Sequence, residues 1–451
     1  MSGLSARVAA RLCVKAEHPL PVGAAQAAKV RLLHGIGVNL ISSRLDAATV
    51  AWHTVEDEAG DCTVIGRGKQ LTESAAAFAN SVAAHNSLLE DCGPGGLREG
   101  SHPSTYVLPA ALAAAEHRGA TGRELLTAII VGYEAVGLLG TVSPTSIVAR
   151  RFRPLGVMGP IGAAAAAAVI YGCDEQEMAA ALSVAANCAA GFGQGFVAGS
   201  MEPYLHAGFA SRNGLLAARL ARTGVTVSYD AFEGPYGFFE TYGGEGVQEA
   251  TDETAYAVER VGTKRFAACL QNQESLTLIS EQLPVPFDVA EIARVRLFRP
   301  ATPNNGTASP GVGSAPPYRT MLQRQMSARF TAAAALLDRD VDDVRYFHEA
   351  ADDEPVERVS ALVELIATDE ASVRVEVDTV DGRTLSAAGD RSAILYPTSE
   401  EIRSRFRSRA ATVLGEASEL VEPLVDKLEE LDDVRTLSKL LRPSGTSVAS
   451  Y

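Results

Sequence analysis

The stretch GPIGAAAAAAVIYG, residues 159–172, is an apolar run in which most side chains are alanine or glycine. Small helix-forming residues allow neighbouring helices to approach closely, and a run of this length is too short to cross a bilayer. We therefore expect an internal helix that is packed against other helices on nearly every face.

Similar alanine-rich stretches follow one another from Ser5 to about residue 225, joined by short Gly, Pro, Ser and His connections. Their apolar residues recur every three or four positions, which indicates helices. Helix ends are also marked, because Thr121 precedes Glu124 in a capping-box pattern and Gly119 ends the preceding helix. These patterns predict a large all-α body.

The pattern changes near Lys264. Residues 293–300 and 371–389 alternate apolar and polar side chains, and the second segment carries an Asp381-Gly382 hairpin turn. Because the intervening residues 329–340 are helical in pattern, we expect a smaller α+β domain.

Two further segments complete the chain. The stretch 300–318 is rich in Gly, Pro, Ser and Asn, a composition typical of a mobile flap or a linker. After Pro397, a capping box at residues 398–401 begins the last helices. We expect these helices to return to the helical body, because they would otherwise have little to pack against.

Composition restricts the classes of partner. The 451 residues include 40 Lys and Arg against 55 Asp and Glu, a formal charge of −15, without a basic block. Nucleic acid and acidic membranes are therefore not expected as partners. The six cysteines form no CxxC pair and the N-terminus lacks a signal-peptide pattern, so a cytoplasmic location is expected.

His102, in the segment SHPSTYVLP, and Arg153, in ARRFRPLGVMGP, are the first two candidates for a functional site. A helix N-terminus can lower the pKa of His102 and orient it for acid–base chemistry, or the ring can simply cap the helix. Arg150, Arg151 and Arg153 precede a glycine-rich helix start, which suits either an anion site or a solvated basic turn.

Lys264, in the segment TKRFAACLQNQ, is the third candidate, because a lysine at a domain junction can clamp an anionic substrate. Cys269 either faces the same cleft or is a small buried side chain. Residues His85, Asp91, Cys92 and His102 lack metal-ligand spacing, and GFGQGF (191–196) lacks the strand of a dinucleotide fingerprint. We therefore expect neither a metal nor an organic cofactor.

Taken in order, several segments resemble the MmgE/PrpD family, which includes 2-methylcitrate dehydratase, cis-aconitate decarboxylase and iminodisuccinate epimerase. The matching segments are AAH followed by an acidic turn, HPSTYVLPAALAAAE, GRELLTAIIVGYE, RRFRPLGVMGPIGAAAAAA, YLHAGFASRNGLLAARLARTG, FEGPYGF, KRF, ALLDRD and YPTSEEI. The resemblance implies a helical domain built from both chain ends (1–262 and 398–451), an α+β lid domain (263–397), a homodimer, and cofactor-free acid–base chemistry on small polycarboxylates.

The resemblance also implies which residues act. His102 occupies the position of the family's HPS histidine, and Lys264 that of the lysine in the KRF motif of the cis-aconitate decarboxylases. Five positions that are polar in the family differ here, and these are Leu88, Arg153, Pro203, Cys269 and Phe330. An acid–base site tuned for a tricarboxylate should not survive these changes.

We therefore predict a cytoplasmic lyase or isomerase that acts on a small, less highly charged metabolite of a specialised pathway, most simply by eliminating water or phosphate. His102 transfers the proton, Lys264 binds a carboxylate or assists as an electrophile, and Arg153 binds an anionic group. Asp91 orients a partner, and His85 lies behind the site or caps a helix.

Two alternatives remain open from the sequence. One is a family member that has lost catalysis and acts as a binding or scaffold protein. The other is a non-redox cyclase for a less charged intermediate, with Leu88, Pro203 and Phe330 as the walls of its cleft.

Overall fold

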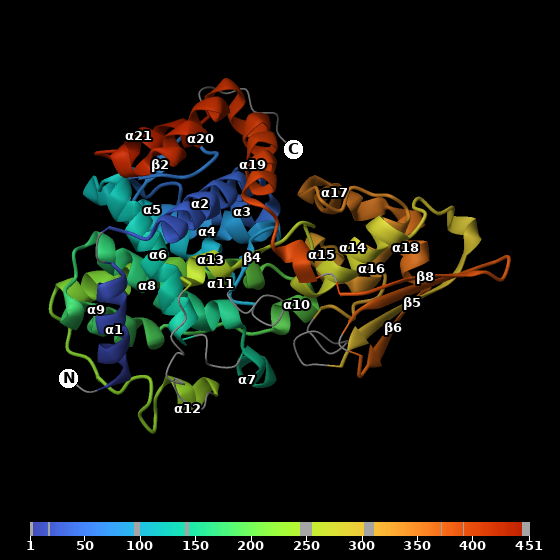
Figure 1. The fold of residues 1–451 in the computed structure, drawn as a ribbon, viewed down its shortest axis with the longest axis horizontal. Helices are drawn as coiled ribbons and strands as arrows, with labels where there is room; N and C mark the ends of the chain where they lie inside the picture. Colours follow the sequence, from blue (N-terminus) through green and yellow to red (C-terminus); the bar gives the residue numbers. More distant parts are fainter. Residues whose placement is uncertain are drawn as a thin grey trace.

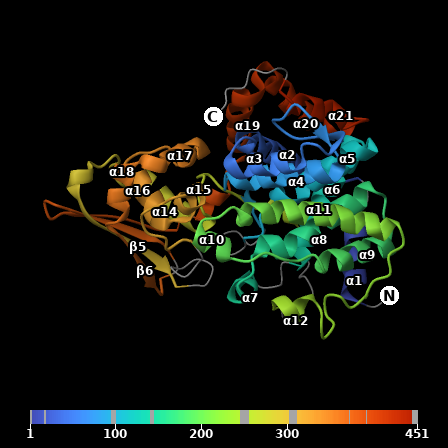
Figure 2. The ribbon, with the colours of Figure 1, turned by 180° about the vertical axis from the view of Figure 1, so that it is seen from behind.

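The computed structural model describes residues 3–16, 19–93, 100–139, 144–243, 255–301, 311–370, 372–390 and 392–443. Most of these residues are helical, and a smaller region combines helices with a four-stranded sheet. Figures 1 and 2 show the helical part on one side and the sheet, with its covering helices, on the other. The prediction of a mainly α protein with a smaller α+β region is confirmed.

The alanine-rich run forms α8 (Pro154–Ile170) at the centre of the helical part. Helix α8 packs between α6 (Gly122–Leu139) and α11 (Glu202–Arg222), and residues 163–168 have no exposed surface. Gly214 of α11 allows this approach, because a Cβ atom there would lie 2.5 Å from the Cβ of Ala163. The expectation of an internal, closely packed helix is confirmed.

The other helices before the sheet surround this centre. They are α1 (Leu4–Lys15), α2 (Val22–Ser42), α3 (Asp46–Val55), α4 (Glu73–Asn86), α5 (Val107–Arg118), α7 (Pro144–Ala149), α9 (Glu175–Ala186), α10 (Gln194–Ala198), α12 (Phe238–Tyr242) and α13 (Ala257–Arg260). The predicted cap of α6 is present, since Thr121 and Glu124 bond to each other's backbone, and Gly119 ends α5 with a φ of 64°.

This part of the chain is not purely helical. Strands β1 (Ala59–Thr63) and β2 (Gln70–Leu71) form a small antiparallel hairpin around a turn that contains two glycines. A second pair joins distant segments, because β3 (Asp91–Cys92) runs antiparallel to β4 (Gly262–Thr263). Strands β2, β3 and β4 have only two residues each and leave no alternating pattern in the sequence, and neither pair was predicted.

The α+β part is built on a sheet with the strand order β6-β5-β7-β8. Strand β5 (Ile292–Pro300) runs parallel to β6 (Val363–Thr368) and antiparallel to β7 (Arg374–Thr379). Strands β7 and β8 (Thr384–Ala388) form the predicted hairpin, and Gly382 in its turn has a φ of 88°. The helices of this part are α14 (Gln273–Gln282), α15 (Met321–Met326), α16 (Ala328–Leu336), α17 (Val344–Glu349) and α18 (Glu354–Ser360).

The last helices lie against the helical part, not the sheet (Figure 1). They are α19 (Ser399–Leu414), α20 (Ser418–Asp426) and α21 (Arg435–Ser438). Phe406 of α19 and Val421 of α20 belong to the same apolar core as the alanines of α8. Both ends of the chain therefore contribute to one helical body.

The expected flap at 300–318 lies partly outside the described residues, which omit 302–310. Residues 311–318 are packed against the α+β part. Val312 is fully buried and Tyr318 is 3% exposed, and both belong to its core. Among the described helices, none combines the length and the apolar character needed to cross a membrane.

The contact between α8 and α11 generates a prediction for stability. A Gly214→Ala side chain would lie 2.7 Å from the backbone nitrogen of Ala164 and 2.8 Å from the carbonyl oxygen of Pro160, neither of which can move without shifting α8. We expect the free energy of unfolding in urea to fall by about 1–3 kcal/mol. Gly68→Ala is the control, because no atom lies within 4 Å of its new Cβ, and equal losses in the two variants would refute the packing argument.

Candidate active site

The short β3–β4 ladder fixes the position of the candidate site. It pairs Asp91 with Thr263, so that Glu90, just before β3, lies beside Lys264, just after β4. Helix α4 ends four residues before Glu90 and carries His85 in its last turn. The site therefore lies where the helical part meets the first residues of the α+β part.

Two residues near this ladder have a strained backbone. Leu88 and His102 both have a φ of 53°, in the left-handed region that residues other than glycine rarely adopt. Leu88 lies in the turn that leads from α4 to Glu90, and His102 directly precedes the short 3₁₀ helix Pro103–Thr105. Such strain persists only where the surroundings enforce it, and it is concentrated at functional sites.

The carboxylate of Glu90 is the centre of a buried cluster of four side chains. Its Oε1 atom lies 2.5 Å from Nζ of Lys264, 3.3 Å from Nδ1 of His85 and 3.5 Å from Nδ1 of His102. The side chains of Glu90 and His85 are fully buried, Lys264 is 1% exposed and His102 is 8% exposed. We call these four residues the Glu90 cluster.

The electrostatics of the cluster follow from its burial and from the lysine. Burial alone raises the pKa of Glu90, but Lys264, and then His85 and His102, more than offset that effect and hold this pKa well below its usual range. Burial, followed by Lys264, lowers the pKa of His102 well below 6.5. At neutral pH the cluster therefore holds one anion, one ammonium group and two neutral imidazoles.

The hydrogen bonds of His102 identify its tautomer. Its Nδ1 lies 2.7 Å from the backbone carbonyl oxygen of Asp91, and a carbonyl can only accept, so Nδ1 carries the proton. In the neutral ring, Nε2 then has a free lone pair, and none of the described residues bonds to it. His102 thus has the protonation state and the residual exposure of a general base.

His85 is held by Arg153. Since a guanidinium can only donate, Nη2 of Arg153 donates to Nε2 of His85, which leaves the proton of the imidazole on the Nδ1 that faces Glu90. Burial lowers the pKa of His85 to about 4, so this ring is neutral. Nη1 of Arg153 donates to the carbonyl oxygen of Pro203, and the guanidinium lies 4.7 Å above the ring of Phe196.

Asp91 contacts His102 only through its backbone. The carboxylate of Asp91 accepts hydrogen bonds from the hydroxyl of Tyr133 at 2.6 Å and from the backbone and hydroxyl of Ser104 at 2.9 and 2.8 Å. Burial raises the pKa of this carboxyl to about 6. The carboxylate therefore anchors the 3₁₀ helix that follows His102, while the carbonyl orients the imidazole.

The other predicted site residues are placed differently. Leu88 is buried in the turn before Glu90, and the carbonyl of Pro203 accepts from Arg153. The Cys269 thiol is buried, donates to Gln271 and has its pKa raised by burial, which does not suit a nucleophile. Phe330 packs against Tyr318, Tyr346 and Phe347 within the α+β core and has no described contact with the Glu90 cluster.

Sequence reasoning missed Glu90 and Tyr204. Glu90 was considered only as what remained of the family's acidic turn, although it makes the closest contact with Lys264. Tyr204 lies edge-on to His85, at 6.0 Å between ring centres, and its hydroxyl donates to Gln325 of α15 at 2.8 Å. The sequence did contain a signal for Tyr204. This residue directly follows Pro203, one of the five positions that differ from the family.

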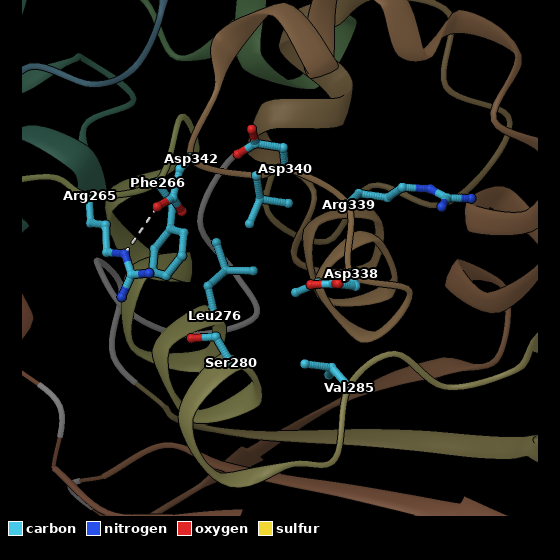
Figure 3. Close-up of a pocket in the computed structure, with 11 residues that line it drawn as sticks. Arg265, Phe266, Leu276, Ser280, Val285, Asp338, Arg339, Asp340 and Asp342 are labelled. Carbon is cyan, nitrogen blue, oxygen red and sulfur yellow. Dashed lines mark hydrogen bonds and ion pairs between the residues drawn. The ribbon is translucent and has the colours of Figure 1, made fainter. Parts of the chain in front are cut away.

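A pocket of 280 Å³ lies apart from the cluster, within the α+β part. Figure 3 shows Leu276, Ser280 and Val285 among the side chains that line it, and a dashed line joins Arg265 to Asp342, at 3.2 Å. Arg339 points away from this pocket (Figure 3) and pairs with Asp353 at 2.9 Å. None of the Glu90 cluster lines it, so we do not assign the reaction to this pocket.

The fold and the site together define a mainly helical protein with a buried acid–base cluster at its junction with an α+β domain. The model of the MmgE/PrpD N-terminal domain matches residues 8–250, and the chain belongs to the MmgE/PrpD family.

Curated relatives match over nearly the whole chain. The cis-aconitate decarboxylase-like protein oryM of Aspergillus oryzae is 26% identical over 94% of both chains. The cis-aconitate decarboxylase of Homo sapiens is 29% identical over 84% of this chain and 82% of its own, and that of Mus musculus is 27% identical over 97% and 93%.

The Glu90–Lys264 pair generates a prediction for stability. Glu90→Gln leaves a buried ammonium without its counter-ion, and Lys264→Met leaves a buried carboxylate, so each change should cost about 3–5 kcal/mol of unfolding free energy. The double variant should lose clearly less than the sum of the two, because neither charge remains. Urea unfolding of all four proteins measures this cycle.

The control for this cycle is the pair of Arg383 and Asp381, which lies 2.7 Å apart with more than half of each side chain exposed. Solvent screens such a pair, so Arg383→Met should change stability far less than either buried substitution. Additive losses in the Glu90 and Lys264 variants would show that the two charges do not depend on each other.

Proposed function

We propose that this protein is a cofactor-independent lyase that removes a proton next to a carboxylate of a small anionic metabolite and expels a leaving group, water or phosphate, from the neighbouring carbon. The names of the curated relatives describe lyases, which supports the reaction class. The observation that carries the proposal is His102, neutral and fixed by Asp91, whose Nε2 lone pair has no described partner.

In the proposed reaction, His102 and the leaving group account for the proton and for both electron pairs. Nε2 of His102 takes the proton from the carbon next to the carboxylate, and the electron pair of the C–H bond becomes the new C=C bond. The leaving group departs with the electron pair of its bond to carbon. Where it departs as hydroxide, the imidazolium of His102 returns the proton and water is released.

Lys264 and Arg153 serve different purposes in this proposal. The ammonium of Lys264 stabilises the negative charge that develops on the substrate carboxylate, because Lys264 and His102 contact the same oxygen of Glu90 in a buried cluster. Nη1 and Nη2 of Arg153 each donate one hydrogen bond, and the bond to His85 fixes the tautomer of that ring. In this proposal, other N–H groups of the same guanidinium bind an anionic group of the substrate.

The family resemblance favours a homodimer, the cysteine pattern a cytoplasmic location, and the substituted site residues a role in a specialised pathway. These three stay predictions.

The first test replaces the proposed base. In D₂O, the protein should exchange the proton next to the carboxylate of at least one of malate, cis-aconitate and 3-phosphoglycerate, which NMR detects even where no leaving group departs. His102→Gln should slow this exchange about 10²- to 10⁴-fold, the usual contribution of a general base.

His117→Gln is the matched control, because His117 is a half-exposed imidazole, 3.3 Å from Asp61 and remote from the cluster. It should leave the exchange rate unchanged. Binding of these acids without exchange in the wild-type protein would refute the lyase and favour a binding protein, and exchange that survives His102→Gln would assign the base elsewhere.

The protonation state of His102 generates a prediction for the pH profile. A base with its pKa held well below 6.5 stays deprotonated as the pH falls through 6.5 and loses activity only at lower pH. We therefore expect kcat/KM for the exchanged substrate to remain constant between pH 7.5 and pH 6. A profile that falls to half at pH 6.5 would contradict the buried, neutral imidazole.

A further inference from the structure

A second group of basic side chains lies between α2 and α19. Arg31, His34 and Gly37 follow one another on one face of α2, at the spacing of successive helical turns. A Cβ atom at Gly37 would lie 3.3 Å from the ring of Phe406 and 3.7 Å from Cδ of Arg409. This glycine therefore allows α19 to pack closely against α2 (Figure 1). The charges of Arg405 and Arg409 on α19 then act on His34 of α2.

The basic groups of this face lack partners for several of their atoms. Nε of Arg31, Nδ1 of His34 and Nη1 of Arg405 are buried and form no hydrogen bond. His34 is 1% exposed and Arg31 is 9% exposed. Within the part of the chain that the structure describes, neither Arg405 nor Arg409 pairs with a carboxylate. The two arginine atoms are buried donors on charged groups, and such donors are costly without a partner, so they favour an anion beside them.

The nearest acidic groups are already engaged. On the α+β side, Asp342 pairs with Arg265 at 3.2 Å, and Asp343 caps the backbone nitrogen of Arg345 at 2.8 Å. On α19 itself, Glu401 accepts from the backbone nitrogen of Thr398 at 2.7 Å.

The basic groups also repel one another. Burial, and then Arg405, lowers the pKa of Arg409 to about 10, and burial followed by Arg409 lowers that of His34 well below 6.5. Among the described residues, none of the three arginines forms a direct ion pair with a carboxylate, so their mutual repulsion is unfavourable unless a ligand neutralises it.

We propose that Arg31, His34, Arg405 and Arg409 form a binding site for hydrogen phosphate. Guanidinium groups bind the oxygens of a tetrahedral oxyanion through charge-assisted hydrogen bonds. Nε2 of His34 donates to the carbonyl oxygen of Leu89 at 3.1 Å, so its buried Nδ1 carries a lone pair at neutral pH. That lone pair accepts the P–OH of hydrogen phosphate, which neither sulfate nor a dicarboxylate supplies.

The phosphate site is separate from the Glu90 cluster but adjoins it through two residues. His34 contacts Leu89, which precedes Glu90, and Nη1 of Arg31 donates to the hydroxyl of Thr263, which precedes Lys264. Arg405 and Arg409 are only partly buried, so a small ion can reach the site from the α19 side. A bound anion would therefore stabilise the two strands that hold the Glu90–Lys264 pair.

Isothermal titration calorimetry on the full chain, at constant ionic strength and neutral pH, tests the site with inorganic phosphate, sulfate and succinate as probes. We expect saturable binding of phosphate that is stronger than that of sulfate or succinate. Arg405→Gln and Arg409→Gln should each weaken it about tenfold or more, since each removes a charge-assisted contact.

Arg407→Gln is the matched control, because Arg407 lies on the same helix, is half-exposed and pairs with Glu422 at 3.1 Å. This variant, and His102→Gln, should bind phosphate as the wild-type protein does, so that the phosphate site and the proposed reaction can fail independently. A crystal of the wild-type protein soaked in phosphate should show the anion between the two helices, even if the arginine variants fold poorly.

Three results would overturn the proposal. They are the absence of saturable phosphate binding to the wild-type protein, equal affinity in the Arg405 and Arg409 variants, and a phosphate-soaked crystal without an anion between α2 and α19. Equal affinity for phosphate and sulfate would also overturn the assignment of hydrogen phosphate, because His34 would then make no contribution as an acceptor.

Discussion

The ion pair between Glu90 and Lys264 is the interaction on which the site depends. Both side chains are buried, and each would be very costly to bury alone. Their 2.5 Å contact is possible only because β3 and β4 bring together segments that lie 174 residues apart. The pair therefore ties the polar turn of the helical body to the first residues of the α+β part, and it sets the electrostatic environment of the two histidines beside it.

The protonation states of these histidines follow from that environment. Burial and the nearby ammonium oppose a second positive charge, so both rings are neutral, and their tautomers are then fixed by what each ring touches. Asp91 fixes His102 through a carbonyl, whereas Arg153 fixes His85 through a donated hydrogen bond. The guanidinium of Arg153 thus adds a charge to the site and orients another residue of it.

The fold could be predicted from the sequence because its signals are local. Alanine-rich helical periodicity, the capping boxes at Thr121 and Thr398 and the Asp381-Gly382 turn each act within a few residues, and the structure contains all of them. His102 and Lys264 were candidates from their own segments, and the family resemblance then favoured them. Glu90 was not, because its role is created by the pairing of two-residue strands, which leave no periodic pattern.

The positions that differ from the family also show that the sequence alone does not place every site residue. Leu88 and Pro203 do lie close to the cluster, since one shapes the turn before Glu90 and the other offers its carbonyl to Arg153. Phe330 instead fills the core of the α+β part. In the sequence, an apolar residue beside the cluster looks the same as an apolar residue in the α+β core. Only the packing around the side chain distinguishes the two.

The basic residues of α2 and α19 extend the argument beyond the cluster. His34 of α2 contacts Leu89 and Arg31 of α2 contacts Thr263, the residues that precede the two members of the ion pair, so basic groups adjoin both segments of the pair. In an acidic protein, this concentrates positive potential around one carboxylate. A positive potential favours bound anions and opposes imidazolium, which agrees with the lowered pKa values of His34, His85 and His102.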